Sequence, residues 1–193
     1  MAPAQVTAAD IREFDVHGQI LGDGAPVYVE RFIHAALYRA RPDIAAIVHS
    51  HAHTLVPFGA TEQSLRPIWH MAGFIPDHVP VFEIRRFGGE ETNMLISDNA
   101  LGDRLADVLG DSSIVLMRGH GATVVGESVQ QAVFRAIYAQ LNAGIQLAAM
   151  QLGSVTYLNA AEAAHADDNN SGQVMRAWNM WVEELPGGAD RNG

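Results

Sequence analysis

The sequence predicts an α/β fold, a single layered domain in which helices pack against a sheet. Segments with apolar residues at helical spacing alternate along the chain with short apolar runs of strand length. The 193 residues are enough for one substantial core, and no internal repeat or linker divides them. This alternation favours an α/β or α+β layered domain, but it does not fix the order of the strands.

Four segments have the periodicity of amphipathic helices. The first covers Val29–Arg39 and is stopped by Pro42. The second begins after Ser97 or Asp98 as N-cap and ends at Gly110. The other two cover residues 128–152 and 174–184.

Short apolar runs predict the strands. Ile44–Val48 and Ser113–Met117 are typical of buried strands, whereas the prolines around Val79–Phe82 favour an edge strand. A further short strand is expected near Ile11–Val16, followed by a turn at Leu21–Gly24. We expect a loop at residues 167–172, one domain over residues 1–185, and a mobile tail at 186–193.

The composition excludes several functions. Twelve basic and 22 acidic residues give a formal net charge of −10, which argues against nucleic acid or an anionic membrane as the main partner. The chain has no cysteine, so disulfides and thiolate metal sites are excluded. It shows no signal peptide and no apolar stretch of about 18 residues, and we therefore expect a cytoplasmic protein.

Three histidines follow the first buried strand at alternate positions: His49, His51 and His53. Side chains alternate between the faces of a strand, so these imidazoles would point to one side. Neighbouring same-face positions lie about 7 Å apart, so two rings can reach one ion while the third is better placed as a supporting partner.

A further metal ligand is expected from His120, which follows the strand Ser113–Met117 and is flanked by Gly119 and Gly121. Glycines on both sides allow a sharp turn and a close approach of the backbone to a site. Neutral imidazole is a common ligand of zinc and also suits iron, copper and nickel. A single histidine is more often a surface or core residue, but this pattern predicts a metal pocket at one edge of the sheet.

An acidic residue, Glu30, begins the first helix, one turn before His34. A carboxylate at this position commonly stabilises the helix macrodipole. Here it also shortly precedes the histidine strand, so a functional role is the alternative.

Four segments together resemble the class II aldolase/adducin superfamily over about Pro3–Leu158. They are Glu30–Tyr38, Arg41–Asp43, Ile47–His51 and Leu116–Gly121. The resemblance implies a central, mainly antiparallel sheet flanked by helices. It also implies a homotetramer or another homo-oligomer.

The resemblance carries roles onto individual residues. His49, His51 and His120 match the histidines that bind one divalent metal ion, and Glu30 matches the glutamate that acts as acid and base. The N-terminal part of the family domain, with a glycine-containing loop that binds phosphate or carboxylate, has no counterpart here, and we expect it to be absent.

One branch of the superfamily is more similar than the sugar-phosphate aldolases. Residues 28–34, 70–74 and 117–121 resemble decarboxylases of hydroxylated aromatic or pyridine dicarboxylates, such as 3-hydroxy-2-methylpyridine-4,5-dicarboxylate 4-decarboxylase. This resemblance implies a lyase with a carboxylate substrate and a manganese-type ion, with zinc or iron as alternatives. Arg118 would bind a second carboxylate and His70 would contact substrate, although structural roles are open for both.

Three other functions use the same features. A metal-dependent aldolase would hold an enediolate of a small hydroxy keto acid or sugar phosphate on the same ion. An adducin-like module would keep the fold for association, but it has no physical need for converging imidazoles. Oxygen chemistry at Fe(II) is the third alternative.

Overall fold

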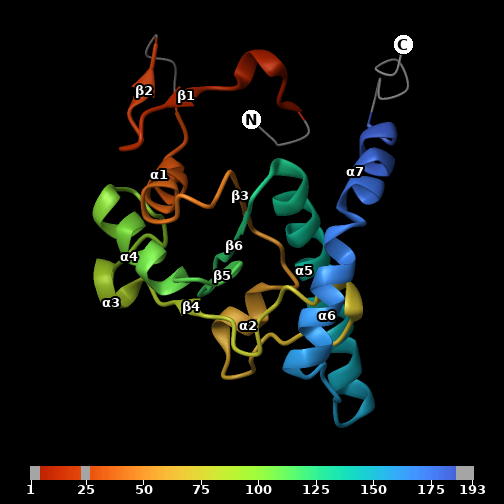
Figure 1. Ribbon diagram of the computed structural model, residues 1–193. Helices are drawn as coiled ribbons and strands as arrows, with labels where there is room; N and C mark the ends of the chain where they lie inside the picture. The colour runs from red at the N-terminus through yellow and green to blue at the C-terminus, as the bar shows by residue number, and fades with distance from the viewer. Residues whose placement is uncertain (1–4, 23–26, 186–193) are drawn as a thin grey trace.

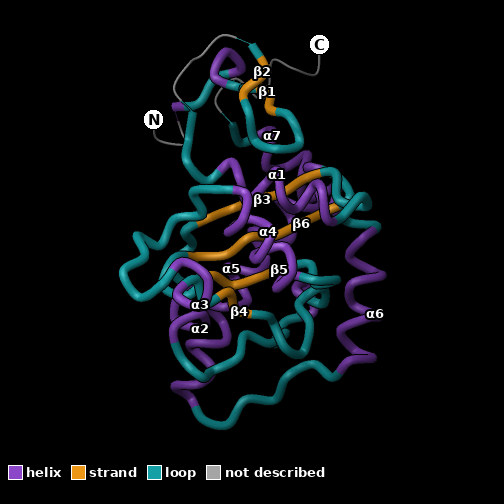
Figure 2. The backbone as a smooth tube through the Cα atoms, turned by 90° about the vertical axis from the view of Figure 1, so that its left-hand side faces the viewer, coloured by secondary structure: helices purple, strands orange, loops and turns teal. Residues whose placement is uncertain are grey.

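A four-stranded sheet lies at the centre of the molecule in a computed structural model that describes residues 5–22 and 27–185. Its order is β3-β6-β5-β4, which Figure 2 shows edge to edge. β3 pairs antiparallel with β6, β6 pairs antiparallel with β5, and only the short edge strand β4 runs parallel to its neighbour. The predicted mainly antiparallel sheet is thereby confirmed. The bounds are β3 Ala46–Ser50, β4 Val81–Phe82, β5 Ile114–Met117 and β6 Gly121–Gly126.

Helices cover both faces of this sheet. α1 (Arg31–Ala40) and α4 (Asn99–Leu109) pack together on one side, and α5 (Val129–Leu152) lies along β3 and β6 on the other (Figure 1). α2 (Val56–Ala60) joins the α5 side against β5. The result is a helix–sheet–helix arrangement, as the alternating sequence pattern predicts.

The strand β5 shows how the sequence builds two cores. Val115 and Met117 belong to the cluster under α1 and α4, whereas Ile114 and Leu116 belong to the cluster under α5. All four are almost completely buried. A continuous apolar run is therefore needed, because alternate side chains enter opposite layers.

Smaller elements surround these layers. β1 (Glu13–Phe14) and β2 (Ile20–Leu21) form a separate hairpin preceded by the 3-10 helix η2 (Ala8–Asp10). The others are the 3-10 helix η3 (His70–Ala72) and the helices α3 (Arg85–Gly88), α6 (Ala160–Ser171) and α7 (Val174–Glu183). Among the described residues, no helix is both long and apolar enough to cross a membrane.

The sequence located the main helices because their ends carry local signals. The Asp98 carboxylate accepts a hydrogen bond from the amide of Leu101, and Ser128 caps α5 in the same way through Gln131. The turn at Leu21–Gly24 lies partly, and the tail at 186–193 wholly, outside the described residues.

Three expectations about local structure need correction. β3 begins and ends two residues later than the predicted Ile44–Val48 and includes His49, because its register with β6 continues to Ser50. β6 was not predicted, since its glycine-rich sequence has no alternating pattern of its own. The predicted loop at 167–172 is instead largely the last part of α6.

α6 forms because of a local cap at its start and a tertiary contact at its end. Asn159 and Glu162 make a capping box at its start. At its end the buried side chain of Asn170 donates a hydrogen bond of 2.7 Å to the carbonyl oxygen of His70. This tertiary contact is made by Asn170, a polar residue that the sequence placed in a loop.

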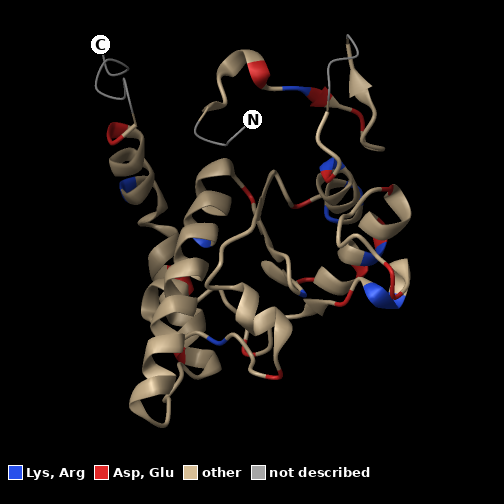
Figure 3. Cartoon of the chain, turned by 180° about the vertical axis from the view of Figure 1, so that it is seen from behind, with Lys and Arg blue, Asp and Glu red and all other residues tan. Residues whose placement is uncertain are grey.

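The long helix α5 carries one charged residue, Arg135, and Figure 3 shows it as an almost uncoloured helix. Leu141 and Ile145 on this helix are exposed. The remaining charges are scattered, with both signs interspersed over the other elements of Figure 3.

We predict that Gly102→Ala destabilises the protein by about 1–3 kcal/mol, because the close packing of α4 on α1 leaves no room for a side chain. A Cβ at Gly102 would lie 2.6 Å from the carbonyl oxygen of Phe32. Gly144→Ala in α5 is the matched control, since its nearest neighbour would be Thr54 at 3.9 Å. The control should be neutral or more stable by roughly 0.5–1 kcal/mol in urea unfolding. Equal effects of the two substitutions would contradict the packing argument.

Candidate functional site

The ends of β3 and β6 bring the predicted histidines together. His49 lies in β3 opposite Thr123, and His51 follows the last residue of that strand. His120 immediately precedes β6, whose second residue, Ala122, pairs with Ser50. Histidines that are about 70 residues apart in the sequence therefore lie at one edge of the sheet.

The turn between β5 and β6 depends on its two glycines. Gly119 has a φ of +64°, which side chains rarely adopt. A Cβ at Gly121 would collide with the carbonyl oxygen of Ser50. The two glycines predicted a sharp turn and a close approach of the backbone, and both are confirmed.

Glu30 joins the histidines from the start of α1. Its Oε2 lies 3.3 Å from His49 Nε2, 3.4 Å from His120 Nε2 and 3.9 Å from His51 Nε2. Its Oε1 accepts a hydrogen bond of 3.3 Å from the amide of Ile96, which fixes the plane of the carboxylate. One oxygen is thus held by the backbone while the other faces the imidazoles.

The imidazole nitrogens meet at short distances. His51 Nε2 lies 3.2 Å from His49 Nε2 and 2.8 Å from His120 Nε2. One ligand atom from each of these histidines and from Glu30 lies within 4.8 Å of all the others. Such a set of nitrogen and oxygen donors fits a divalent metal ion, for which ligand distances are about 2.0–2.2 Å.

The tautomers of two histidines are fixed by backbone carbonyls. His120 Nδ1 lies 2.8 Å from the carbonyl oxygen of Met94, and His49 Nδ1 lies 3.2 Å from that of Ala122. A carbonyl oxygen only accepts, so each Nδ1 carries the proton. In the neutral rings, both Nε2 atoms are then unprotonated, and both lie close to His51 Nε2 and to the Glu30 carboxylate. This arrangement requires positive charge, either protons or a metal ion.

The electrostatics agree with this requirement. Burial alone would raise the pKa of Glu30, but hydrogen bonds from His120 and His49 outweigh it and hold that pKa well below its usual range. The hydrogen bond to Glu30 in turn raises the pKa of His120. His51 behaves differently, because partial burial and the two neighbouring histidines lower its pKa.

Three members of the cluster, Glu30, His49 and His51, line a cavity of about 610 Å³, whereas His120 is not among its lining residues. The side chains of Glu30, His49 and His120 are at most 13% exposed, whereas that of His51 is 66% exposed. The site is therefore sheltered on the protein side and open beside His51. The cavity is lined by Tyr28, Glu30, His34, His49, Ser50 and His51.

Arg118 does not line this cavity. Its Nε lies 2.7 Å from Glu83 Oε2, and its guanidinium also approaches the sulfur of Met94 at 3.4 Å. Hydrogen bonds from Arg85 and Arg118 lower the pKa of Glu83 to about 2. The predicted carboxylate binder is thus engaged in an ion pair with an ionised glutamate.

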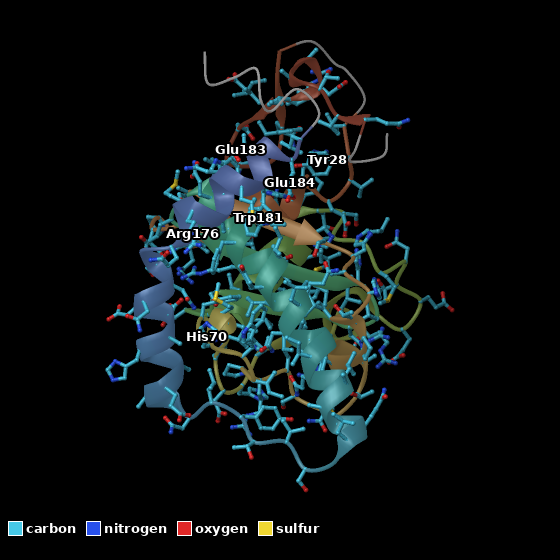
Figure 4. All side chains as sticks on the ribbon, turned by 90° about the vertical axis from the view of Figure 1, so that its right-hand side faces the viewer. Tyr28, His70, Arg176, Trp181, Glu183 and Glu184 are labelled. Carbon is cyan, nitrogen blue, oxygen red and sulfur yellow. The ribbon has the colours of Figure 1, made fainter. Side chains whose placement is uncertain are left out.

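His70 also lies outside the residues that line the cavity. It is the first residue of η3, its ring packs edge-on against Trp69, and its carbonyl oxygen is bound by Asn170. Figure 4 shows His70 at mid-height on the left and Tyr28 in the upper part of the molecule on the right. Its contact with substrate stays a prediction.

Two cavity residues, Tyr28 and His34, were given no role from the sequence. Their rings pack edge-on with centroids 6.1 Å apart. The spacing of His34 four residues after Glu30 was visible, and it indicated a shared helix face. His53 is exposed and is not part of the cluster of potential ligands found among residues 5–22 and 27–185.

The layered fold and this histidine–glutamate cluster define a mixed α/β protein with a candidate divalent metal site. The profile of the family described as Class II Aldolase and Adducin N-terminal domain matches residues 1–147. The chain belongs to this family, and the resemblance seen in the sequence is confirmed.

Similar proteins include two named decarboxylases. The chain is 36% identical to Decarboxylase tropJ from Talaromyces stipitatus, over 97% of this chain and 80% of that protein. It is 32% identical to the 3,4-dihydroxyphthalate decarboxylase of Rhodococcus jostii, over 86% of this chain and 66% of the relative. A crystal structure of an aldolase II superfamily protein from Pseudomonas syringae superposes with a TM-score of 0.72 and 25% identity, over 93% of this chain and 72% of that one.

We predict that acid destabilises the metal-free protein partly through His34. Burial, together with the nearby His49, lowers the pKa of His34 to about 4. The unfolded chain therefore binds a proton on His34 near pH 6.5, whereas the folded protein binds that proton only near pH 4. Above pH 7 His34 has no such effect on the free energy of unfolding. As pH falls to 4, the effect lowers that free energy by up to about 3 kcal/mol.

Urea unfolding at pH 7, 5.5 and 4.5 measures this effect. His34→Leu should lose less stability on acidification than the wild type. His165→Leu, at an exposed position of α6, serves as control. A pH dependence that His34→Leu leaves unchanged would contradict the prediction.

Proposed function

We propose that this protein is a divalent-metal-dependent lyase that decarboxylates a hydroxylated aromatic or pyridine carboxylate. The observation that carries the proposal is the convergence of three imidazole nitrogens and one carboxylate oxygen beside a cavity that Glu30, His49 and His51 line. The names of the two decarboxylase relatives support the choice of reaction.

In this proposal His49, His51 and His120 hold the metal ion. Their three Nε2 atoms face one another, and the Nδ1 atoms of His49 and His120 are already bound to backbone carbonyls. Imidazole and carboxylate donors suit manganese, zinc or iron. When bound, such an ion supplies a Lewis acid that stabilises negative charge on a ring oxygen beside the departing carboxylate.

Glu30 is proposed as the acid that completes the reaction. Breaking the carbon–carbon bond releases carbon dioxide and leaves an electron pair on the ring carbon, which must then accept a proton. Glu30 lies on the cavity wall with Oε2 directed at the cluster and Oε1 held by the amide of Ile96. Because its low pKa leaves Glu30 ionised, the carboxylate would first receive a proton within the site and then deliver it at one side of the ring.

Aldol cleavage is the second candidate, because the same donor set and cavity would serve it and the family includes aldolases. Release of carbon dioxide, as against release of an aldehyde from a hydroxy keto acid or sugar phosphate, separates the two reactions. An adducin-like association role is less well supported, since association alone does not require the clustered lone pairs.

The predictions about the oligomer, Arg118, the location and the domain boundary differ in how well they are supported. The exposed apolar side chains Leu141 and Ile145 on the nearly uncharged helix α5 support a homo-oligomer. The ion pair of Arg118 with Glu83 weakens its proposed role as substrate anchor. The cytoplasmic location, the single-domain boundary and the carboxylate substrate stay predictions.

Metal analysis tests the ligand assignment. We expect about one manganese or zinc ion per chain in the wild type and clear loss of affinity in His120→Ala, because one of three imidazole ligands is removed. His165→Ala on α6 is the matched control and should keep its metal. Equal metal content in His120→Ala and the wild type would contradict the assignment.

The role of Glu30 is tested by carbon dioxide release from a panel of ortho-hydroxy aromatic carboxylates. Glu30→Gln should lower kcat by roughly 10²–10⁴-fold, because the amide cannot deliver the proton. Glu91→Gln, at an exposed position, is the control and should retain the wild-type rate. Full activity of Glu30→Gln with normal metal content would exclude Glu30 as the acid.

A further inference from the structure

His34 is a polar side chain of the cavity without a hydrogen-bond partner in the described part of the chain. It lies on α1 one turn after Glu30 and lines the same cavity. Its recorded ring contact is the edge-on packing with Tyr28. The ring is sheltered enough for burial to lower its pKa to about 4, so it is neutral at pH 7 with one N–H donor.

The nitrogens of His34 keep some accessible surface. They are not among the fully enclosed side-chain nitrogen and oxygen atoms that lack a hydrogen bond within residues 5–22 and 27–185. The imidazole of His34 also lines a second cavity of about 370 Å³, on the side of the β1–β2 hairpin. A sheltered polar group that lacks a protein partner costs stability unless a ligand or water binds it.

Aromatic rings surround this imidazole. Tyr28 stands edge-on to His34, and Phe14 stands edge-on to Tyr28 with centroids 6.0 Å apart. Tyr28 is half exposed at the end of the molecule labelled in Figure 4. Rings in such an arrangement favour contact with a flat aromatic ligand.

We propose that His34 donates a hydrogen bond to a second carboxylate of the substrate, the one that stays on the ring, and thereby selects aromatic dicarboxylates over monocarboxylates. This inference rests on the proposed function. The inference goes beyond the proposed function because it assigns a residue that determines substrate specificity.

The spacing along α1 supports this assignment. One helical turn rises about 5.4 Å, which is close to the width of a substituted aromatic ring. A ring whose hydroxyl lies at the histidine cluster and whose leaving carboxylate lies beside Glu30 would therefore direct the neighbouring carboxylate along α1 towards His34. The alternative anchor, Arg118, is already paired with Glu83 and does not line the cavity.

The test compares two ligands that differ only in the second carboxylate, 3,4-dihydroxyphthalate and 2,3-dihydroxybenzoate. Binding is measured by calorimetry on the zinc-loaded Glu30→Gln protein, so that turnover does not consume the ligand. The same protein is then made with His34→Leu, which keeps apolar bulk, with His34→Gln, which keeps a donor, and with His165→Leu as control.

We expect His34→Leu to weaken binding of 3,4-dihydroxyphthalate by roughly tenfold or more while leaving 2,3-dihydroxybenzoate within about twofold. His34→Gln should recover part of the loss, and His165→Leu should change neither ligand. Equal weakening of both ligands, an unchanged preference, or no binding of either acid would overturn the inference.

Carbon dioxide release by the wild type separates this inference from the proposed function. Binding that depends on His34 without any release of carbon dioxide would contradict decarboxylation but keep the dicarboxylate site. Release of carbon dioxide with no effect of His34→Leu on the ligand preference would support the reaction and reject the role of His34.

Discussion

The site depends on one electrostatic constraint, the convergence of histidine lone pairs and a carboxylate on a single point. His49 and His120 are fixed as Nδ1–H tautomers by backbone carbonyls, so their Nε2 atoms, which both lie close to His51 Nε2, are unprotonated when the rings are neutral. Glu30 adds a negative charge to the same point. Only protons or a cation can stabilise this arrangement, and the pKa values of Glu30 and His120 shift in the directions that such mutual stabilisation requires.

A short loop before α4, residues 94–96, forms hydrogen bonds with two members of the cluster, His120 and Glu30. The carbonyl of Met94 accepts from His120, and the amide of Ile96 donates to Glu30. Met94 has a φ of 70°, the only positive φ of a non-glycine residue among those described. Such a conformation costs about 1–3 kcal/mol and persists only where the surroundings impose it. The strain turns the carbonyl of Met94 towards His120 and fixes its tautomer.

The strand ends shelter part of the cluster from solvent, whereas the cavity along helix α1 leaves the cluster accessible. The side chains of His49 and His120 are enclosed because they belong to the paired ends of β3 and β6, whereas His51 lies past the last strand residue and is exposed. The cavity then runs along α1 from Glu30 to His34. A metal ion at the strand ends and an aromatic ligand along the helix would use separate parts of one rigid framework.

The sequence by itself determined the layered class, the main helices and the residues of the cluster. Local signals were sufficient, since Asp98 and Ser128 cap helices and the spacing of His49 and His51 marks a shared face. Only the tertiary structure decided β6, the helical state of α6, the engagement of Arg118 by Glu83 and the position of His34 in the cavity. These features depend on partners distant in sequence, such as β3 and β5 for β6 and His70 for the last turn of α6, and no local pattern encodes such contacts.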